Sequence, residues 1–222
     1  MTVRLAVFDC DGTLSDGQAA ICAAMAEGFA EAGLAAPDPH QVRRIVGLSL
    51  PSAVARLAPD ETPEMHARAV AAYKQAFFRA RERGLVQEPL FDGVAALLTR
   101  LHRTGWTLGV ATGKSDRGLK HCLEQHDIHA RFVSLQTADR HPSKPHPSMV
   151  EKAIDDAGGS ASSTIVVGDT SFDMAMAANA GATGIGAAWG YHEAEDLLDA
   201  GAVAVAHQPG EVVDLIREHV DG

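Results

Sequence analysis

The sequence of 222 residues has little of what several protein classes need. Its three cysteines (Cys10, Cys22 and Cys122) are odd in number and none forms a CxxC pair. A disulfide framework or a zinc site is therefore not expected, and reduced thiols in the cytosol are the simpler interpretation. No uninterrupted apolar run approaches the roughly 18 residues of a membrane-spanning helix, and the N-terminus lacks a signal-peptide pattern. We therefore expect a soluble, cytoplasmic protein with no membrane partner.

Positive charge is also scarce. The chain has 19 Lys and Arg against 29 Asp and Glu, a formal net charge of −10, and a pI near 5.5. Binding to a nucleic-acid backbone needs a basic face, so this balance argues against a nucleic-acid partner. The 46% hydrophobic and 22% charged residues are typical of a globular chain. The length allows a substantial core in one domain with an insertion or in two small domains.

Over much of the chain, short apolar runs alternate with amphipathic helical stretches. In the stretch after Gly93, for example, Val94, Leu97 and Leu101 fall on one helical face. Near-continuous apolar strands separated by helices predict a parallel sheet covered on both faces, which is an α/β doubly wound, Rossmann-like core. Another helix is expected to have Pro145 near its start. The predicted strands are 3–8, 107–111, 131–135, 164–168 and 202–206, with a further candidate at 183–189.

The segment from Asp16 to Glu88 differs, because it contains no convincing strand. It is rich in alanine and is interrupted by prolines. We expect residues 16–88 to form a helical cap over the carboxyl end of the sheet, where open α/β folds bind ligands. Residues 1–15 and 89–222 would then form the α/β core. The predicted cap helices are 18–33, 39–47, 50–58 and 63–83.

Polar side chains follow several of the predicted strands. In a parallel sheet, groups at the carboxyl ends of the strands gather at one edge. Clustered carboxylates repel one another, so such a cluster needs a cation, a proton or a reaction. Oxygen-rich ligation without thiols suits a hard cation, and Mg²⁺ is the usual choice where a phosphate shares the site. The residues gathered in this way are Asp9, Asp11, Thr112, Lys144, Asp169 and Asp173.

Four segments carry a resemblance to a known family. FDCDGTLSD, ATGK, SKPHP and VGDTSFD, in this order, resemble the four motifs of the haloacid dehalogenase superfamily. The match covers essentially the whole chain. A helical insertion straight after the first motif resembles the subfamily with an α-helical cap, and the details are most similar to phosphoglycolate phosphatase and its relatives.

The resemblance implies a Mg²⁺-dependent phosphatase that acts on a small phosphorylated metabolite through an aspartyl-phosphate. Asp9 would be the nucleophile, and Asp11 would protonate the leaving oxygen and later deprotonate water. Thr112 and Lys144 would hold the phosphoryl group. The implied metal set is Asp9, Asp169, the backbone carbonyl of Asp11, and Asp173 in support. The implied substrate-binding residues are Gly12, Thr13, Gly113, Arg43, Arg44 and Gly47.

Other activities of the superfamily stay open. Asp11 favours phosphate ester hydrolysis, because dehalogenases lack a carboxylate at that position. Thr13 makes a β-phosphoglucomutase-like phosphotransferase less favoured, because those relatives usually carry an apolar residue there. An inorganic pyrophosphatase also fits the motifs. An alternative from another class is a receiver-type module that only holds a phospho-aspartate, although receivers are much shorter and lack the second carboxylate.

The sequence does not decide which cap arginine faces the site or whether Lys114 is buried. In caps of the resembling kind, a glycine-containing loop reaches over the pocket, and Gly47 follows Arg43 and Arg44 closely. Arginine binds carboxylates in bidentate fashion, so one of the two could recognise a small acidic leaving group such as glycolate. As neighbours on a helix, at most one can easily point inward. For Lys114, exposure to solvent and a position in the site are equally compatible with the sequence.

Overall fold

The computed structural model describes residues 3–219 and contains a six-stranded sheet in the order β3-β2-β1-β4-β5-β6. All neighbouring strands are parallel. The chain order reverses on either side of β1, which places a topological switch point beside this strand. The strands are β1 Arg4–Phe8, β2 Trp106–Thr112, β3 Ser134–Thr137, β4 Thr164–Gly168, β5 Thr183–Ala187 and β6 Ala202–Ala206. The predicted α/β doubly wound fold is confirmed.

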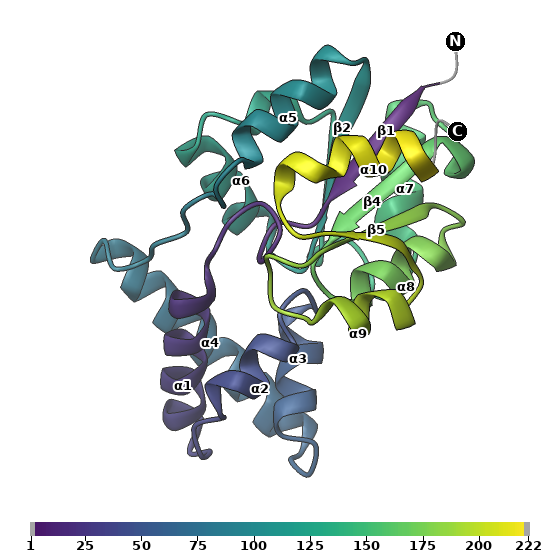
Figure 1. Cartoon of the computed structure of the whole chain (residues 1–222). Coiled ribbons are helices and arrows are strands. Elements are labelled where there is room, and N and C mark those ends of the chain that lie inside the picture. The colour runs from purple at the N-terminus through teal and green to yellow at the C-terminus, as the bar shows by residue number, and fades with distance from the viewer. Residues whose placement is uncertain (1–2, 220–222) are drawn as a thin grey trace.

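Helices cover both faces of the sheet (Figure 1). Along β1, Ala6 and Phe8 point into one apolar cluster, which α5, α6 and α10 complete. Leu5 and Val7 point into a second cluster, formed with α7 and α8 on the opposite face. This alternation explains why the strand is continuously apolar. The helices are α5 Val94–Arg103, α6 Asp116–Gln125, α7 Ser148–Ala157, α8 Ser171–Asn179, α9 Ala194–Asp199 and α10 Val212–His219, with 3₁₀ turns η1 His129–Arg131, η2 Ala161–Ser163 and η3 Pro209–Glu211.

Four further helices form a separate lobe at the carboxyl end of the strands, on the far side from both termini (Figure 1). They have an apolar cluster of their own, which includes Met25, Phe29 and Val54. Helices α1 and α4 pack closely, since a Cβ at Gly28 would lie 2.7 Å from the Tyr73 nitrogen. The helices are α1 Gln18–Ala32, α2 Pro39–Arg44, α3 Leu50–Leu57 and α4 Pro63–Glu82.

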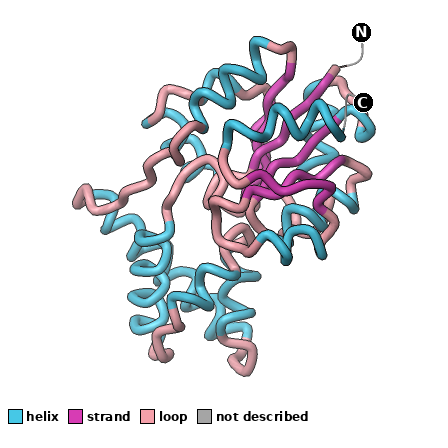
Figure 2. Tube along the Cα trace, in the orientation of Figure 1, coloured by secondary structure: helices cyan, strands magenta, loops and turns pink. Residues whose placement is uncertain are grey.

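Loops join this lobe to the rest of the molecule (Figure 2). The outgoing and returning connections run side by side, because the Asp16 amide donates to the Pro89 carbonyl at 2.8 Å. The division into a core of residues 1–15 and 89–222 and a cap of residues 16–88 remains our proposal for the domain boundaries. Among the described helices, none is long and apolar enough to cross a membrane.

Two local predictions were wrong. The strand predicted at 131–135 begins only at Ser134, and Arg131 belongs to the turn η1. The pairing of β3 with β2 starts at Ser134 opposite Gly109, so the apolar residues before it belong to the connection, and Val133 is exposed. The other error concerns Pro145, which lies outside α7 because that helix begins at Ser148. Apolar pattern alone does not separate a strand from the connection that leads into it.

Candidate active site

The residues of the predicted site lie at the carboxyl ends of three adjacent strands. Asp9 follows β1, Thr112 ends β2 and Asp169 follows β4. All three are nearly or fully buried. Lys144 reaches the same place from the loop before α7, and Asp173 reaches it from the first turn of α8. The parallel sheet therefore brings together the predicted groups that are far apart in the sequence.

Lys144 joins two of the carboxylates. Its Nζ atom lies 2.8 Å from Asp9 Oδ1 and 2.7 Å from Asp173 Oδ1, and all three side chains are buried. Asp173 is oriented by the capping box of α8, in which the Thr170 amide donates to Asp173 Oδ2 at 3.1 Å, and the Thr170 hydroxyl donates to the same oxygen at 2.6 Å. Asp9 Oδ1 also accepts from the Cys10 amide at 2.6 Å. These bonds fix Asp9 through one oxygen.

Asp169 is held by the loop that follows β1 and by the segment after β5. The Thr13 hydroxyl donates to Asp169 Oδ1 at 2.7 Å, and the Tyr191 amide donates to Oδ2 at 3.0 Å. Gly12 approaches closely, since a Cβ there would lie 2.1 Å from Asp169 Oδ2, and its φ of +87° also favours glycine. Gly12 and Thr13 thus shape the surroundings of Asp169.

The arrangement of carboxylates fits a divalent cation. Asp9, Asp169 and Asp173 each present one oxygen within 4.8 Å of the others. Among the described residues, the buried Asp9 Oδ2 has no hydrogen-bond partner. An all-oxygen donor set of this kind suits Mg²⁺. The carboxylate of Asp11 is not part of this group, and ligation through its backbone carbonyl remains a prediction.

Burial and mutual repulsion disfavour the charged carboxylates. Burial raises the pKa of Asp9 to about 7, with Lys144 opposing the shift. The pKa of Asp169 is also raised well above its ordinary value, by burial first and then by Asp9 and Asp173. A cation bound among these groups would favour their ionised forms. The site is therefore electrostatically prepared for a positive ion.

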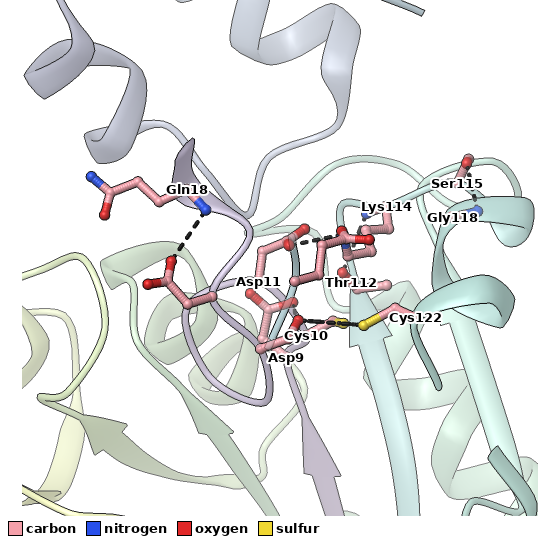
Figure 3. A network of polar contacts seen from close by, with 12 residues as sticks. Asp9, Cys10, Asp11, Gln18, Thr112, Lys114, Ser115, Gly118 and Cys122 are labelled. Carbon is pink, nitrogen blue, oxygen red and sulfur yellow. Dashed lines mark hydrogen bonds and ion pairs between the residues drawn. The ribbon is translucent and has the colours of Figure 1, made fainter. Parts of the chain in front are cut away.

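A second group of charges surrounds Asp11, which lies close to Lys114 (Figure 3). Lys114 Nζ lies 2.8 Å from Asp11 Oδ1 and 2.6 Å from Glu88 Oε1. Burial would lower the pKa of Lys114, but the adjacent Asp11 carboxylate reverses this and the pKa is raised. The sequence left Lys114 undecided, and the structure buries it in the site. The sequence did not predict Glu88 as a site residue, because its local sequence carries no signal and its place in the site follows from its contact with Lys114.

The Cys10 side chain points away from Asp9 and Asp11, its neighbours in the sequence (Figure 3). Its Sγ atom lies 3.9 Å from Cys122 Sγ and 3.7 Å from the Ser15 hydroxyl, in the buried layer beneath the site (Figure 3). The hydrogen bond with Cys122, followed by burial, raises the pKa of the Cys10 thiol well above its ordinary value. Such a thiol is a packing element rather than a nucleophile.

The cap touches the site through the loop between α2 and α3. A Cβ at Gly47 would lie 3.7 Å from Asp9 Oδ2 and 3.4 Å from the Thr170 hydroxyl. On the core side, a Cβ at Gly113 would lie 2.4 Å from the Leu48 carbonyl oxygen and 2.6 Å from that of Gly47. The two glycines therefore let the cap loop close directly over Asp9 and the end of β2. Thr112, which is buried, accepts the Lys114 amide at 3.2 Å.

The two cap arginines diverge. Arg44 is exposed and pairs with Asp196 of α9 at 3.0 Å. Arg43 is half-buried and faces α1: with the Gln18 amide oriented so that its oxygen faces the guanidinium, Arg43 Nε donates to it at 2.8 Å. Gln18 follows Asp16, whose carboxylate accepts from the Tyr191 hydroxyl at 3.3 Å. Of the two predicted residues, Arg44 therefore contacts the core, through Asp196, whereas Arg43 contacts Gln18 at the start of α1, within the cap.

Three comparisons relate this chain to known proteins. A family model described as "Haloacid dehalogenase-like hydrolase" matches residues 6–187. A protein of Dickeya dadantii named "Probable phosphatase IndB" is 34% identical over 220 residues, which cover 97% of this chain and 91% of that protein. Phosphoglycolate phosphatase of Vibrio cholerae is 27% identical, with 97% of each chain covered. The crystal structure of a hydrolase from Pseudomonas syringae has the same fold, with a TM-score of 0.85 at 24% identity and coverage of 99% and 100%.

Proposed function

The chain belongs to the haloacid dehalogenase-like hydrolases and is a phosphatase of that family, and we propose that it hydrolyses a small phosphate monoester with Mg²⁺ through an aspartyl-phosphate. The observation that carries this proposal is the state of Asp9. One oxygen of this buried carboxylate is held by Lys144 and the Cys10 amide, and within residues 3–219 the other has no hydrogen-bond partner. That oxygen is available to a cation or to a phosphoryl group.

In the first step, the Asp9 carboxylate attacks phosphorus and the bond to the leaving oxygen breaks. Lys144 contacts Asp9 directly and is placed to offset the negative charge of nucleophile and phosphoryl group. Thr112 offers a hydroxyl at the end of the adjacent strand. Asp9, Asp169 and Asp173 would hold Mg²⁺, which supplies charge neutralisation at the phosphoryl oxygens when bound.

Asp11 pairs with Lys114 rather than with Lys144 and retains slight exposure. In this position it can give its proton to the leaving oxygen and later take one from the water that hydrolyses the aspartyl-phosphate. Burial, the largest influence, raises the pKa of Asp11 and Lys114 opposes this shift. A raised pKa helps a carboxyl group act as an acid near neutral pH.

The leaving group would occupy the space between Asp11 and the cap. The backbone of Gly47 and Leu48 closes over the site, which favours a small leaving group. Arg43 is the cap residue that could bind a carboxylate there. Together with the similarity to phosphoglycolate phosphatase, this supports a small acidic phosphate ester such as phosphoglycolate. We further propose that the enzyme is cytoplasmic and acts on this small metabolite rather than on nucleic acid.

The proposal is tested by measuring phosphate release from phosphoglycolate, hexose phosphates and pyrophosphate, with Mg²⁺ or with excess chelator. We expect multiple turnovers on a monoester that require Mg²⁺ and vanish in Asp9→Asn. Mass spectrometry of the acid-quenched enzyme should find a phosphoryl group on the peptide that contains Asp9. Full activity in chelator or a single turnover would contradict the proposal. A preference for pyrophosphate would favour the pyrophosphatase alternative, and phosphoryl transfer between sugars would favour the mutase.

A further inference from the structure

We propose that Lys114 positions Asp11 for proton transfer, and that Glu88 and Arg81 make this position depend on the seating of the cap. The inference rests on the proposed function, in which Asp11 is the general acid and base. Lys114, Glu88 and Arg81 are not among the residues proposed to hold the phosphoryl group or the metal ion. The inference gives Lys114, the second buried lysine of the site, a role of its own.

Lys114 is placed as a fixed cation. Its side chain is 8% exposed, and its Nζ atom lies 2.8 Å from Asp11 Oδ1 and 2.6 Å from Glu88 Oε1. Burying an ammonium group is costly unless charges and hydrogen bonds compensate it, so these two contacts determine where the amine lies. Its backbone amide is bonded to Thr112 as well. Both ends of the residue are therefore held, and Asp11 is held through it.

Glu88 extends the contact toward the cap. It is 1% exposed, and its second oxygen lies 3.2 Å from Nη2 of Arg81. Arg81 belongs to the last turn of α4, whereas Glu88 lies in the returning connection that leads to α5. The Glu88 carbonyl accepts from His126 Nε2 of the core at 2.7 Å. Glu88 thus contacts both lobes and the lysine that orients Asp11.

Gly17, in the connection that leads from the core to the cap, also lies against Asp11 and Glu88. A Cβ at Gly17 would lie 3.0 Å from Asp11 Oδ1 and 3.5 Å from Glu88 Oε1. The φ of Gly17 is −97°, which any residue can adopt, so the missing side chain leaves room for the Asp11 carboxylate rather than relieving the backbone. Both connections between the lobes therefore abut Asp11.

This placement has a consequence for catalysis. An acid must point at the leaving oxygen, and small misplacements of a catalytic group are costly. With the cap seated as in this structure, Lys114 and the backbone at Gly17 both face Asp11 Oδ1 and restrict the orientation of its carboxylate. A displacement of α4 or of its returning connection would withdraw Glu88 from Lys114, and Asp11 would lose its orientation. Proton transfer would then be efficient only when the cap is closed over a substrate.

The test compares two substrates in each variant, an alkyl phosphate such as phosphoglycolate and 4-nitrophenyl phosphate, whose leaving group needs no proton. For Lys114→Met and Glu88→Gln we expect kcat on the alkyl ester to fall on the order of 10- to 100-fold, within the contribution of a general acid. With the nitrophenyl ester the rate of the first step, measured as the burst of nitrophenolate, should fall less than about threefold, because only the later hydrolysis step then needs Asp11. Arg81→Gln should give the same pattern with a smaller amplitude.

Steric and charge controls complete the design. Gly17→Ala should reproduce the pattern without removing any charge, because its methyl group displaces the Asp11 carboxylate. Gly210→Ala is its control, since a Cβ at Gly210 meets nothing within 4 Å. Lys120→Met removes an exposed lysine on α6 and should change neither substrate. If Lys114→Met fails to fold, as judged by thermal unfolding, Glu88→Gln and Gly17→Ala still decide the outcome.

Equal losses in the first step for both esters, or no loss in Glu88→Gln and Gly17→Ala, would overturn the inference. Asp11→Asn separates this failure from that of the proposed function. If Asp11→Asn loses activity mainly on the alkyl ester while Lys114 and Glu88 variants do not, the positioning role alone is wrong. If Asp11→Asn shows no such preference, the proposed role of Asp11 is itself wrong.

Discussion

Two buried lysines flank the segment that carries Asp9 and Asp11, and their surroundings differ. Lys144 contacts Asp9 and Asp173, which follow the ends of β1 and β4 in the sheet. Lys114 contacts Asp11 and Glu88, and Glu88 belongs to the connection between cap and core. The proposed phosphoryl side of the site is therefore built by core residues at strand ends, in the loop before α7 and in the first turn of α8, whereas the proposed leaving-group side also depends on segments that join the two lobes.

The difference separates two tasks. Stabilising charge on a phosphoryl group requires dipoles and charges that do not move during the reaction, and strand ends in a packed sheet provide them. Recognition of the leaving group can vary between family members, because a fold hosts many specificities through the segments attached to it. Substitutions on the two sides should therefore have different signatures, and the following predictions are arranged from the largest expected effect to the smallest.

Asp9→Asn should abolish the reaction at the phosphoryl group. An amide cannot form the aspartyl-phosphate, so activity should fall to background on every ester. The substitution is nearly isosteric, and thermal unfolding should show a folded protein. Residual turnover that resists removal of contaminating phosphatases would show that Asp9 is not the nucleophile.

Asp11→Asn should affect the leaving-group side. Turnover of an alkyl phosphate should slow by roughly 10²–10⁴, the usual contribution of a general acid or base. The first step with 4-nitrophenyl phosphate should suffer less, because nitrophenolate leaves without a proton. Burst-phase kinetics separate the two steps, and equal losses in the first step for both esters would argue against the acid role.

Lys144→Ala tests the contrast between the two lysines directly. Loss of one preorganised electrostatic group should lower kcat by roughly 10²–10³. In the proposed mechanism Lys144 acts on the phosphoryl group and not on the leaving oxygen, so alkyl and nitrophenyl esters should lose activity in the same proportion. A loss that depends on the leaving group would erase the distinction between the two sides.

Arg43→Ala should change substrate binding and little else. If Arg43 binds the carboxylate of the leaving group, its removal should raise KM for phosphoglycolate by roughly 10-fold, the effect of losing a charged hydrogen bond. Arg44→Ala is the matched control, because Arg44 pairs with Asp196 at the surface. 4-Nitrophenyl phosphate should be handled nearly normally by both. Identical KM values in both variants and the wild type would leave the acidic leaving group without support from the cap.

The smallest expected effect is that of Mg²⁺ on the stability of the folded protein. In the metal-free protein burial raises the pKa of Asp9 from 3.8 to about 7, so the folded state holds a proton that the unfolded chain releases. The free energy of unfolding contributed by this group therefore falls as the pH rises through that interval. Mg²⁺ binds the deprotonated site, so its stabilisation should grow with pH.

Thermal unfolding measures this effect. At a concentration 100 times Kd, Mg²⁺ should contribute about 2.7 kcal/mol. The gain in Tm should be larger near about pH 8 than near about pH 6. Asp169→Asn should reduce the gain, whereas an equal gain in that variant would place the ion elsewhere.

Much of the fold and of the phosphoryl side could be predicted from the sequence. Apolar strands alternating with helices determine a parallel sheet, and a parallel sheet gathers its carboxyl ends at one edge. Asp9, Thr112 and Asp169 stand directly at those ends, so their convergence follows from the topology alone. The cap helices were predictable for a similar reason, because prolines stand at the start of α2, α3 and α4.

The remainder was decided by tertiary structure. Whether Lys114 is solvated or buried depends on Glu88, which is 26 residues away in the sequence and comes close only where the returning connection passes β2. Arg43 and Arg44 are adjacent in the sequence, and only the packing of α2 against α1 and α9 separates their directions. Local periodicity specifies which side of a helix or strand is apolar. It carries no information on which two connections meet, because that meeting is set by long-range packing of the cap on the core.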